Sequence, residues 1–122
     1  MSARRRLPNR RPCLTFDDTL AGVLCAVSYG YDHKLKAGET GKVAFPQSPV
    51  KEIFINGPKS GTMLESIMRD GATSVSVAMQ RGAEPAELAN SLTREPDGTA
   101  ASPIGAVLDD LVSSLPVSAT TN

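Results

Sequence analysis

The 122-residue sequence contains no tryptophan, and only three phenylalanines and two tyrosines. Proteins that bind single-stranded nucleic acid by base stacking need several aromatic rings, and this sequence has few residues that could serve in this way. Histidine occurs once, as His33, and cysteine twice, as Cys13 and Cys25, without a Cys-x-x-Cys pair. These residues do not make the three or four ligands of a zinc site. We therefore expect no metal and no cofactor.

Long apolar segments are also missing. No run approaches the roughly 18 apolar residues of a membrane-spanning helix, and the arginine-rich start lacks the apolar core of a signal peptide. We expect a cytoplasmic protein without membrane contact, in which Cys13 and Cys25 are reduced because disulfides are rare in that compartment. A disulfide between the two is the alternative for an oxidising compartment. Cys25 alone is expected to be a small buried core residue.

Charge is balanced in number but not in position. The formal net charge is zero, yet five positive and no negative side chains fall in the first eleven residues, namely Arg4, Arg5, Arg6, Arg10 and Arg11. The rest of the chain has eight Lys and Arg against thirteen Asp and Glu, a net charge of −5. Residues 1–12 therefore predict a basic arm, extended or disordered, that binds a polyanion or lies on an acidic surface of its own chain or of a partner.

The middle of the sequence predicts strands. "CLTFDD" and "GVLCAVSYGY" are β-rich runs on either side of a turn at Asp18 to Ala21, and Val23, Cys25, Val27 and Tyr29 share one face of the second run. Residues 32–49 are expected to form a long loop with a short strand at Val43 to Phe45. "VKEIFING" is the next strand.

From Thr62 the apolar period changes from two to 3.6, which predicts a helix ending near Gly82. Its expected core face comprises Leu64, Ile67, Met68, Gly71, Ala72, Val75, Ala78 and Met79, with Gly71 allowing a neighbour to approach closely. A short helix is expected at "EPAELANSL", and a last helix follows with Ser102 as N-cap and Pro103 at its first position. Its apolar stripe is Ile104, Val107, Leu108, Leu111, Val112 and Leu115.

This order predicts an α+β fold: a small antiparallel sheet of three to four strands followed by three helices packed on one face. One domain at 13–115 is expected, with a polar tail at 116–122.

The sequence contains no recognisable catalytic pattern. The turn at residues 57–62 resembles an anion-binding helix start, with Lys59, Ser60 and Thr62 as donors, but its glycines and lysine do not have the phosphate-loop spacing. We interpret it as a strand-to-helix junction with Ser60 or Thr62 as N-cap. His33 has no predictable nucleophilic partner. The carboxylate pairs Asp17–Asp18 and Asp109–Asp110 are neighbours in sequence only, so we expect no catalytic residues.

Four pieces stand in a recognisable order: "RRLPNRR" followed by "TF", "EIFI" before a Lys-x-Gly turn, "MRDGA", and "DGTAASPIGAVLDDL". This arrangement resembles the TSCPD domain family over roughly residues 4–115. Members occur as a C-terminal domain of adenosylcobalamin-dependent ribonucleotide reductases and as short stand-alone proteins in bacteria. The resemblance implies the fold more than a reaction, and the place of the family's Thr-Ser-Cys-Pro-Asp motif, "AASPIG", has no cysteine here.

The resemblance implies a non-catalytic accessory module linked to deoxyribonucleotide supply, whose partner is a protein such as a ribonucleotide reductase subunit. The expected contact residues are the five arm arginines together with Lys34, Lys36 and Lys42 of the 32–49 segment. The alternative is a small nucleic-acid-binding or phage-type regulatory protein that uses the arm. A ribonucleoside-diphosphate reductase-type enzyme ranks last, because the chain is too short for the reductase barrel and its active-site cysteines. The oligomeric state is left open.

Overall fold

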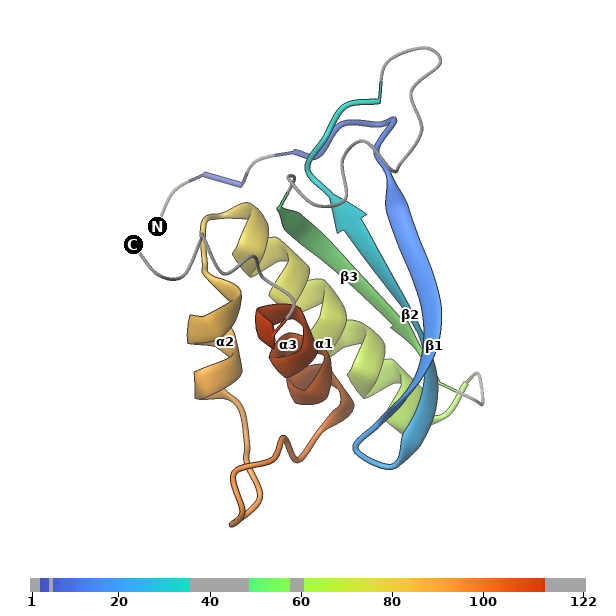
Figure 1. The fold of residues 1–122 in the computed structure, drawn as a ribbon. Coiled ribbons are helices and arrows are strands. Elements are labelled where there is room, and N and C mark those ends of the chain that lie inside the picture. Colours follow the sequence, from blue (N-terminus) through green and yellow to red (C-terminus); the bar gives the residue numbers. More distant parts are fainter. Residues whose placement is uncertain (1–2, 5, 36–48, 58–60, 114–122) are drawn as a thin grey trace.

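A computed structural model describes residues 3, 4, 6–35, 49–57 and 61–113. Three strands, β1 (Cys13–Leu20), β2 (Val23–Tyr31) and β3 (Val50–Asn56), precede three helices, α1 (Met63–Gln80), α2 (Pro85–Ser91) and α3 (Pro103–Ser113). The strands form an antiparallel sheet in the order β1-β2-β3, and the helices lie on one side of it (Figure 1). The predicted α+β fold is confirmed. Val43 to Phe45, where a further short strand was expected, lie outside the described residues.

The first hairpin is tighter than the sequence predicts. β1 continues to Leu20, which pairs with Val23, so the turn is Ala21–Gly22 and not Asp18 to Ala21. Both turn residues have positive φ, 49° for Ala21 and 83° for Gly22, as expected for a two-residue hairpin whose twist matches its strands. Asp18 was misread as a turn residue because aspartate is common in turns.

The helix-facing side of the sheet carries the core. In the register of β2 with β3, Val27 pairs with Ile55 and Tyr29 pairs with Ile53, and all four side chains are buried. Cys25 lies on the same face and is 2% exposed, as predicted. The helices complete this core with Met68, Ala72, Val75, Met79, Ala89, Val107, Leu108 and Leu111.

Helix α1 begins and ends at well-formed caps. The Thr62 hydroxyl accepts a hydrogen bond from the Glu65 N–H at 3.2 Å, and the Glu65 carboxylate accepts one from the Gly61 N–H at 3.3 Å. At the other end Gly82 has a φ of 103°, its N–H donates to Met79, and the Ala83 N–H donates to Ala78, which is a Schellman arrangement. The predicted limits of this helix are confirmed.

The buried face of α1 is rotated from the predicted one. Leu64 and Ile67 were expected in the core but are 50% and 61% exposed, whereas the polar residues Glu65, Ser76 and Gln80 are buried. The reason is that α1 packs along the edge strand β3, whose free backbone groups need polar partners. Gly71 faces α3, where Ile104 is its neighbour.

The segment between α2 and α3 is a small hairpin of its own. Arg94 and Ala100 form an isolated β-bridge, and the Gly98 N–H donates to the Glu95 carbonyl across a Pro-Asp turn. Ser102 then caps α3 by accepting from the Gly105 N–H at 3.2 Å, as predicted. Leu115, expected in the stripe of this helix, lies outside the described residues. None of the helices described is long and apolar enough to cross a membrane.

Candidate functional site

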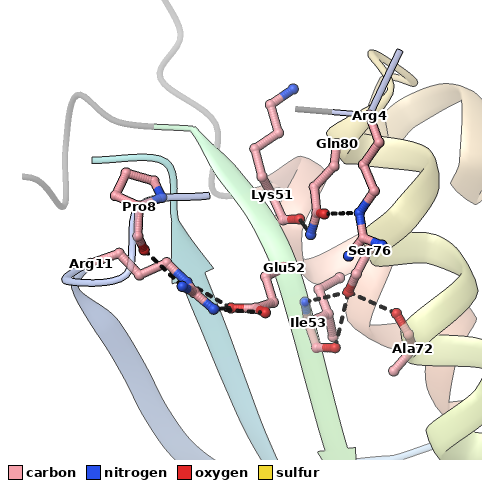
Figure 2. A network of polar contacts seen from close by, with 9 residues as sticks. All are labelled: Arg4, Pro8, Arg11, Lys51, Glu52, Ile53, Ala72, Ser76 and Gln80. Carbon is pink, nitrogen blue, oxygen red and sulfur yellow. Dashed lines mark hydrogen bonds and ion pairs between the residues drawn. The ribbon is translucent and has the colours of Figure 1, made fainter. Parts of the chain in front are cut away.

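The basic arm lies against the body of the same chain. Arg11 forms a forked contact with Glu52 of β3: its Nε and Nη2 lie 3.0 and 2.9 Å from Oε1, and Nη2 lies 3.0 Å from Oε2. Its Nη1 donates to the Pro8 carbonyl at 2.8 Å, which bends the arm around the guanidinium (Figure 2). The exposed fractions of the two side chains are 25% for Arg11 and 14% for Glu52, so this pair is largely shielded from water.

Gly30 makes room for this pair. It stands opposite Glu52 in the β2–β3 register, and a Cβ atom at Gly30 would lie 2.4 Å from Glu52 Oε1. The carboxylate can therefore lie across β2 and reach Arg11 only because this position lacks a side chain.

A second contact fixes the arm at the end of α1. Arg4 Nε donates to Gln80 Oε1 at 2.7 Å, and Gln80 Nε2 donates to the Lys51 carbonyl at 3.0 Å. One amide thus joins the arm, helix α1 and the free edge of β3 (Figure 2). A guanidinium at the carbonyl end of a helix is also favoured by the helix dipole.

Ser76 continues this polar seam along the edge of β3. Its hydroxyl accepts from the Ile53 N–H at 2.8 Å, and its oxygen lies 3.1 Å from the Ile53 carbonyl and 2.8 Å from the Ala72 carbonyl, to either of which it can donate. Ser76 and Gln80 therefore satisfy edge groups that would otherwise be buried and unpaired.

Backbone bonds hold the arm as well. The Tyr31 N–H donates to the Pro12 carbonyl at 3.1 Å, and the Leu35 N–H donates to the Arg10 carbonyl at 2.8 Å. The Pro12 bond continues the β1–β2 register by one pair, and the Leu35 bond holds the arm at Arg10, where the chain bends. The described part of the arm is therefore held on the body by backbone bonds as well as side-chain bonds.

The predicted contact residues consequently divide into two groups. Arg4 and Arg11 hold the arm on the body, whereas Arg6, Arg10 and Lys34 are exposed. In the part of the chain that the structure describes, neither the Arg6 nor the Arg10 side chain forms an ion pair or hydrogen bond. Arg5, Lys36 and Lys42 lie outside the described residues. Arg6 and Arg10 are thus the exposed arginines of the described arm, and Lys34 and Lys51 are the lysines near it.

Of the three candidate anion-binding residues in the turn before α1, Thr62 is the one within the described residues, and there the turn is a strand-to-helix junction. Thr62 serves as the N-cap, so its hydroxyl is occupied by the helix backbone. Lys59 and Ser60, the other two candidates for an anion site, lie outside the described residues.

The remaining titratable residues are placed apart. Cys13 is exposed and lies opposite Gly30 in the β1–β2 register, whereas Cys25 is buried and lies opposite Asp18. Neither thiol forms a disulfide. Burial, and secondarily Asp18, raises the pKa of the Cys25 thiol. His33 lies just beyond β2 and makes a contact of its own. Among the residues described, no three His, Cys, Asp or Glu side chains are grouped to hold a metal ion.

The two carboxylates of each sequence pair, Asp109–Asp110 and Asp17–Asp18, have different surroundings and do not form a shared site, as the sequence predicts. Asp109 accepts two hydrogen bonds of 2.6 Å from Arg94, and these lower the pKa of its carboxyl. Asp110 accepts from the Tyr29 hydroxyl at 3.3 Å, and burial followed by the Asp110 charge raises the pKa of that phenol. Asp17 and Asp18 lie on opposite faces of β1, as their neighbours Ala26 and Cys25 do on β2.

Sequence reasoning missed the body side of this site. Glu52, Gln80 and Gly30 were assigned no role, although each determines where the arm lies. A polar residue at a buried helical position, such as Gln80, is the signal that could have identified one of them. Sequence reasoning also missed a set of exposed apolar side chains, Leu24, Phe54, Met63, Leu64 and Ile67.

Strands followed by helices on one face of a three-stranded sheet define the class of this protein as a small α+β domain. A family model for the TSCPD domain matches residues 20–116 of the 122. The chain therefore belongs to the TSCPD domain family. The arm and most of β1 precede the matched region. Neither a curated protein nor a solved structure gives a significant match.

Proposed function

We propose that this protein is a non-catalytic accessory module of deoxyribonucleotide supply that works by binding another protein. Membership of the TSCPD family supports the link, because that domain also occurs attached to adenosylcobalamin-dependent ribonucleotide reductases. The family alone does not say which surface binds.

The observation that carries the proposal is the fixed arm. Arg4 and Arg11 hold it at both ends, so Arg6 and Arg10 are presented from ordered backbone and not from a free tail. A surface that is ordered before binding loses less conformational entropy when a partner binds. Two exposed arginines whose side chains have no partner among the described residues are suited to contact with a partner's carboxylates.

Affinity capture tests the proposal. The full chain, tagged at its C-terminus so that the arm is undisturbed, is used to capture proteins from lysate of its native host. We expect enrichment of a ribonucleotide reductase subunit or another enzyme of deoxyribonucleotide metabolism. The enrichment should fall with the Arg6→Ala/Arg10→Ala double variant and persist with Arg69→Ala, which removes an exposed arginine on α1. Repeated capture without any such enzyme would contradict the proposal.

Nucleic acid is the second candidate partner, and the docking of the arm limits the number of arginines that can contact phosphates. With Arg4 and Arg11 engaged on the body, the cations on and beside the described arm that are left for phosphates are Arg6, Arg10, Lys34 and Lys51, while Arg81 at the same end has a contact of its own. Four phosphate contacts predict a log–log salt slope of about −3.6 on duplex DNA. Binding that ignores salt would exclude this candidate.

A further inference from the structure

Charge is separated along the described molecule. The end that carries the arm holds seven cations, Arg4, Arg6, Arg10, Arg11, Lys34, Lys51 and Arg81, against three carboxylates, Asp32, Glu52 and Glu84. The rest of the described chain holds Arg69 and Arg94 against nine carboxylates: Asp17, Asp18, Glu65, Asp70, Glu87, Glu95, Asp97, Asp109 and Asp110. The zero formal charge therefore conceals one basic end, which attracts anionic partners and orients them during encounter.

A hollow of about 230 Å³ opens at this basic end. It lies between Ala3 and Leu7 of the arm, Lys51 of β3, and residues 79–82 at the end of α1. Gln80, which accepts a hydrogen bond from Arg4, forms part of the wall of the hollow. The Lys51 side chain extends from β3 beside Gln80 and Arg4 (Figure 2). The hollow is smaller than the roughly 300–1,000 Å³ of sites for drug-sized ligands. It suits one inserted side chain.

The lining combines apolar and cationic residues. Ala3, Leu7 and Met79 supply the apolar contacts, while Lys51 and Arg81 supply charge. No aromatic ring is among the lining residues, so a nucleobase would find nothing to stack on. This combination fits an aliphatic side chain flanked by carboxylates better than a phosphate chain.

We infer that the arm end binds an acidic, extended peptide segment of a partner protein, with one aliphatic side chain in the hollow. The flanking carboxylates then contact Lys51, Arg6 and Arg10. The inference rests on the proposed function and specifies the chemistry of the partner.

A peptide array tests this chemistry with defined probes. The array contains hexapeptides with two or three Asp or Glu and one Leu, Ile or Val at each position, together with acidic hexapeptides of equal charge that lack an aliphatic residue. Single- and double-stranded oligonucleotides are measured alongside by fluorescence anisotropy. We expect the full-length protein to select acidic peptides with an aliphatic residue at a defined position.

Three variants assign the contacts. Arg6→Ala/Arg10→Ala should weaken binding of the selected peptide about five- to tenfold, because partly screened ion pairs are individually weak. Ala3→Phe, which fills the hollow without changing charge, should remove the preference for an aliphatic residue. Arg69→Ala should bind as the wild type does, since Arg69 lies on α1 away from the hollow.

The outcomes separate this inference from the proposed function. No peptide binding, equal binding of peptides without an aliphatic residue, or tighter binding of oligonucleotides would each overturn the inference. Capture of a deoxyribonucleotide enzyme that is lost in Arg6→Ala/Arg10→Ala but unaffected by Ala3→Phe would also overturn it while leaving the proposed function intact. Selective peptide binding without capture of such an enzyme would uphold the inference and count against the proposed function.

Discussion

Ser76 connects helix α1 to the free edge of the sheet through a single hydroxyl. Ser76→Ala would leave the buried Ile53 N–H without its partner at 2.8 Å, and we expect a loss of about 1–3 kcal/mol in the free energy of unfolding. Ser91 is the matched control, because its hydroxyl also bonds the carbonyl one turn earlier but is exposed. Urea denaturation should show Ser91→Ala within about 0.5 kcal/mol of the wild type. Equal effects at both positions would show that the Ser76 bond contributes nothing.

Two glycines should respond to alanine in opposite directions. At Gly71 in α1 a Cβ would lie 3.7 Å from Ile104 Cγ2, an ordinary contact, so Gly71→Ala should stabilise by about 0.5–1 kcal/mol through helix propensity. At Gly30 the Cβ would lie 2.4 Å from Glu52 Oε1 and displace the carboxylate that holds Arg11. Gly30→Ala should therefore destabilise. Thermal unfolding of both variants checks the signs, and a lowered midpoint for Gly71→Ala would contradict the assignment.

At the residue scale, the sequence predicts best where the cause is local. The Ser102 cap and the burial of Cys25 follow from short-range patterns and were predicted, and the Thr62 cap was one of two predicted alternatives. Leu64 and Ile67 were placed in the core wrongly, because periodicity alone gives an apolar stripe but not the neighbour that covers it. The polar face of α1 is determined by the edge of β3, which is known only once the sheet is assembled.

Among the elements, the arm is the one whose position depends on few contacts. Glu52→Gln should weaken the forked pair with Arg11 by about 1–2 kcal/mol and release the arm without unfolding the sheet. Trypsin cleavage after Arg6 and Arg10 should then become about tenfold faster, since 1.4 kcal/mol corresponds to a factor of ten. Glu87→Gln, an exposed carboxylate of α2, is the control. Adding Arg11→Ala to Glu52→Gln should change the rate little further, because the pair is already broken.

The hairpin between α2 and α3 is held by Arg94, which bonds Asp109 and two backbone carbonyls. Because hydrogen bonds from Arg94 lower the pKa of Asp109, the stabilisation is fully present above the ordinary aspartate pKa of about 3.9 and is lost as pH falls through the lowered value. Carboxyl NMR titration should show Asp109 below its usual range, and Arg94→Ala should return it there. Unchanged titration in the variant would mean that Arg94 does not govern this carboxyl.

At the scale of elements, strand and helix order was predictable while their mutual contacts were not. Alternation and 3.6-residue periodicity identified all three described strands and three helices, yet the first turn was misplaced by the two aspartates. Nothing in the order of residues states that Glu52 faces Arg11 or that Gln80 meets Arg4. Those contacts depend on the β2–β3 register and on where α1 crosses the sheet.

At the scale of the whole molecule, the sequence shows that positive charge is concentrated in the first eleven residues, and the structure shows which end of the folded domain carries that charge. The sequence predicts a basic arm that lies on its own chain or reaches outward, and leaves both open. The structure shows that Arg4 and Arg11 contact the body of the chain while Arg6 and Arg10 are exposed, and binding of a polyanion by the arm stays a prediction. A net charge of zero then describes neither the arm end nor the acidic remainder, so the dipole of the molecule governs encounter with partners more than its total charge.

The arm also has a place in the order of synthesis. Arg11 and Arg4 precede their partners Glu52 and Gln80 by 41 and 76 residues. At about 5–20 residues per second, Gln80 is added about 4–15 s after Arg4. During that interval the two guanidinium groups do not yet have their Glu52 and Gln80 acceptors. Docking of the arm is thus among the last steps of folding, and its protection from trypsin on nascent chains would report that β3 and α1 are complete.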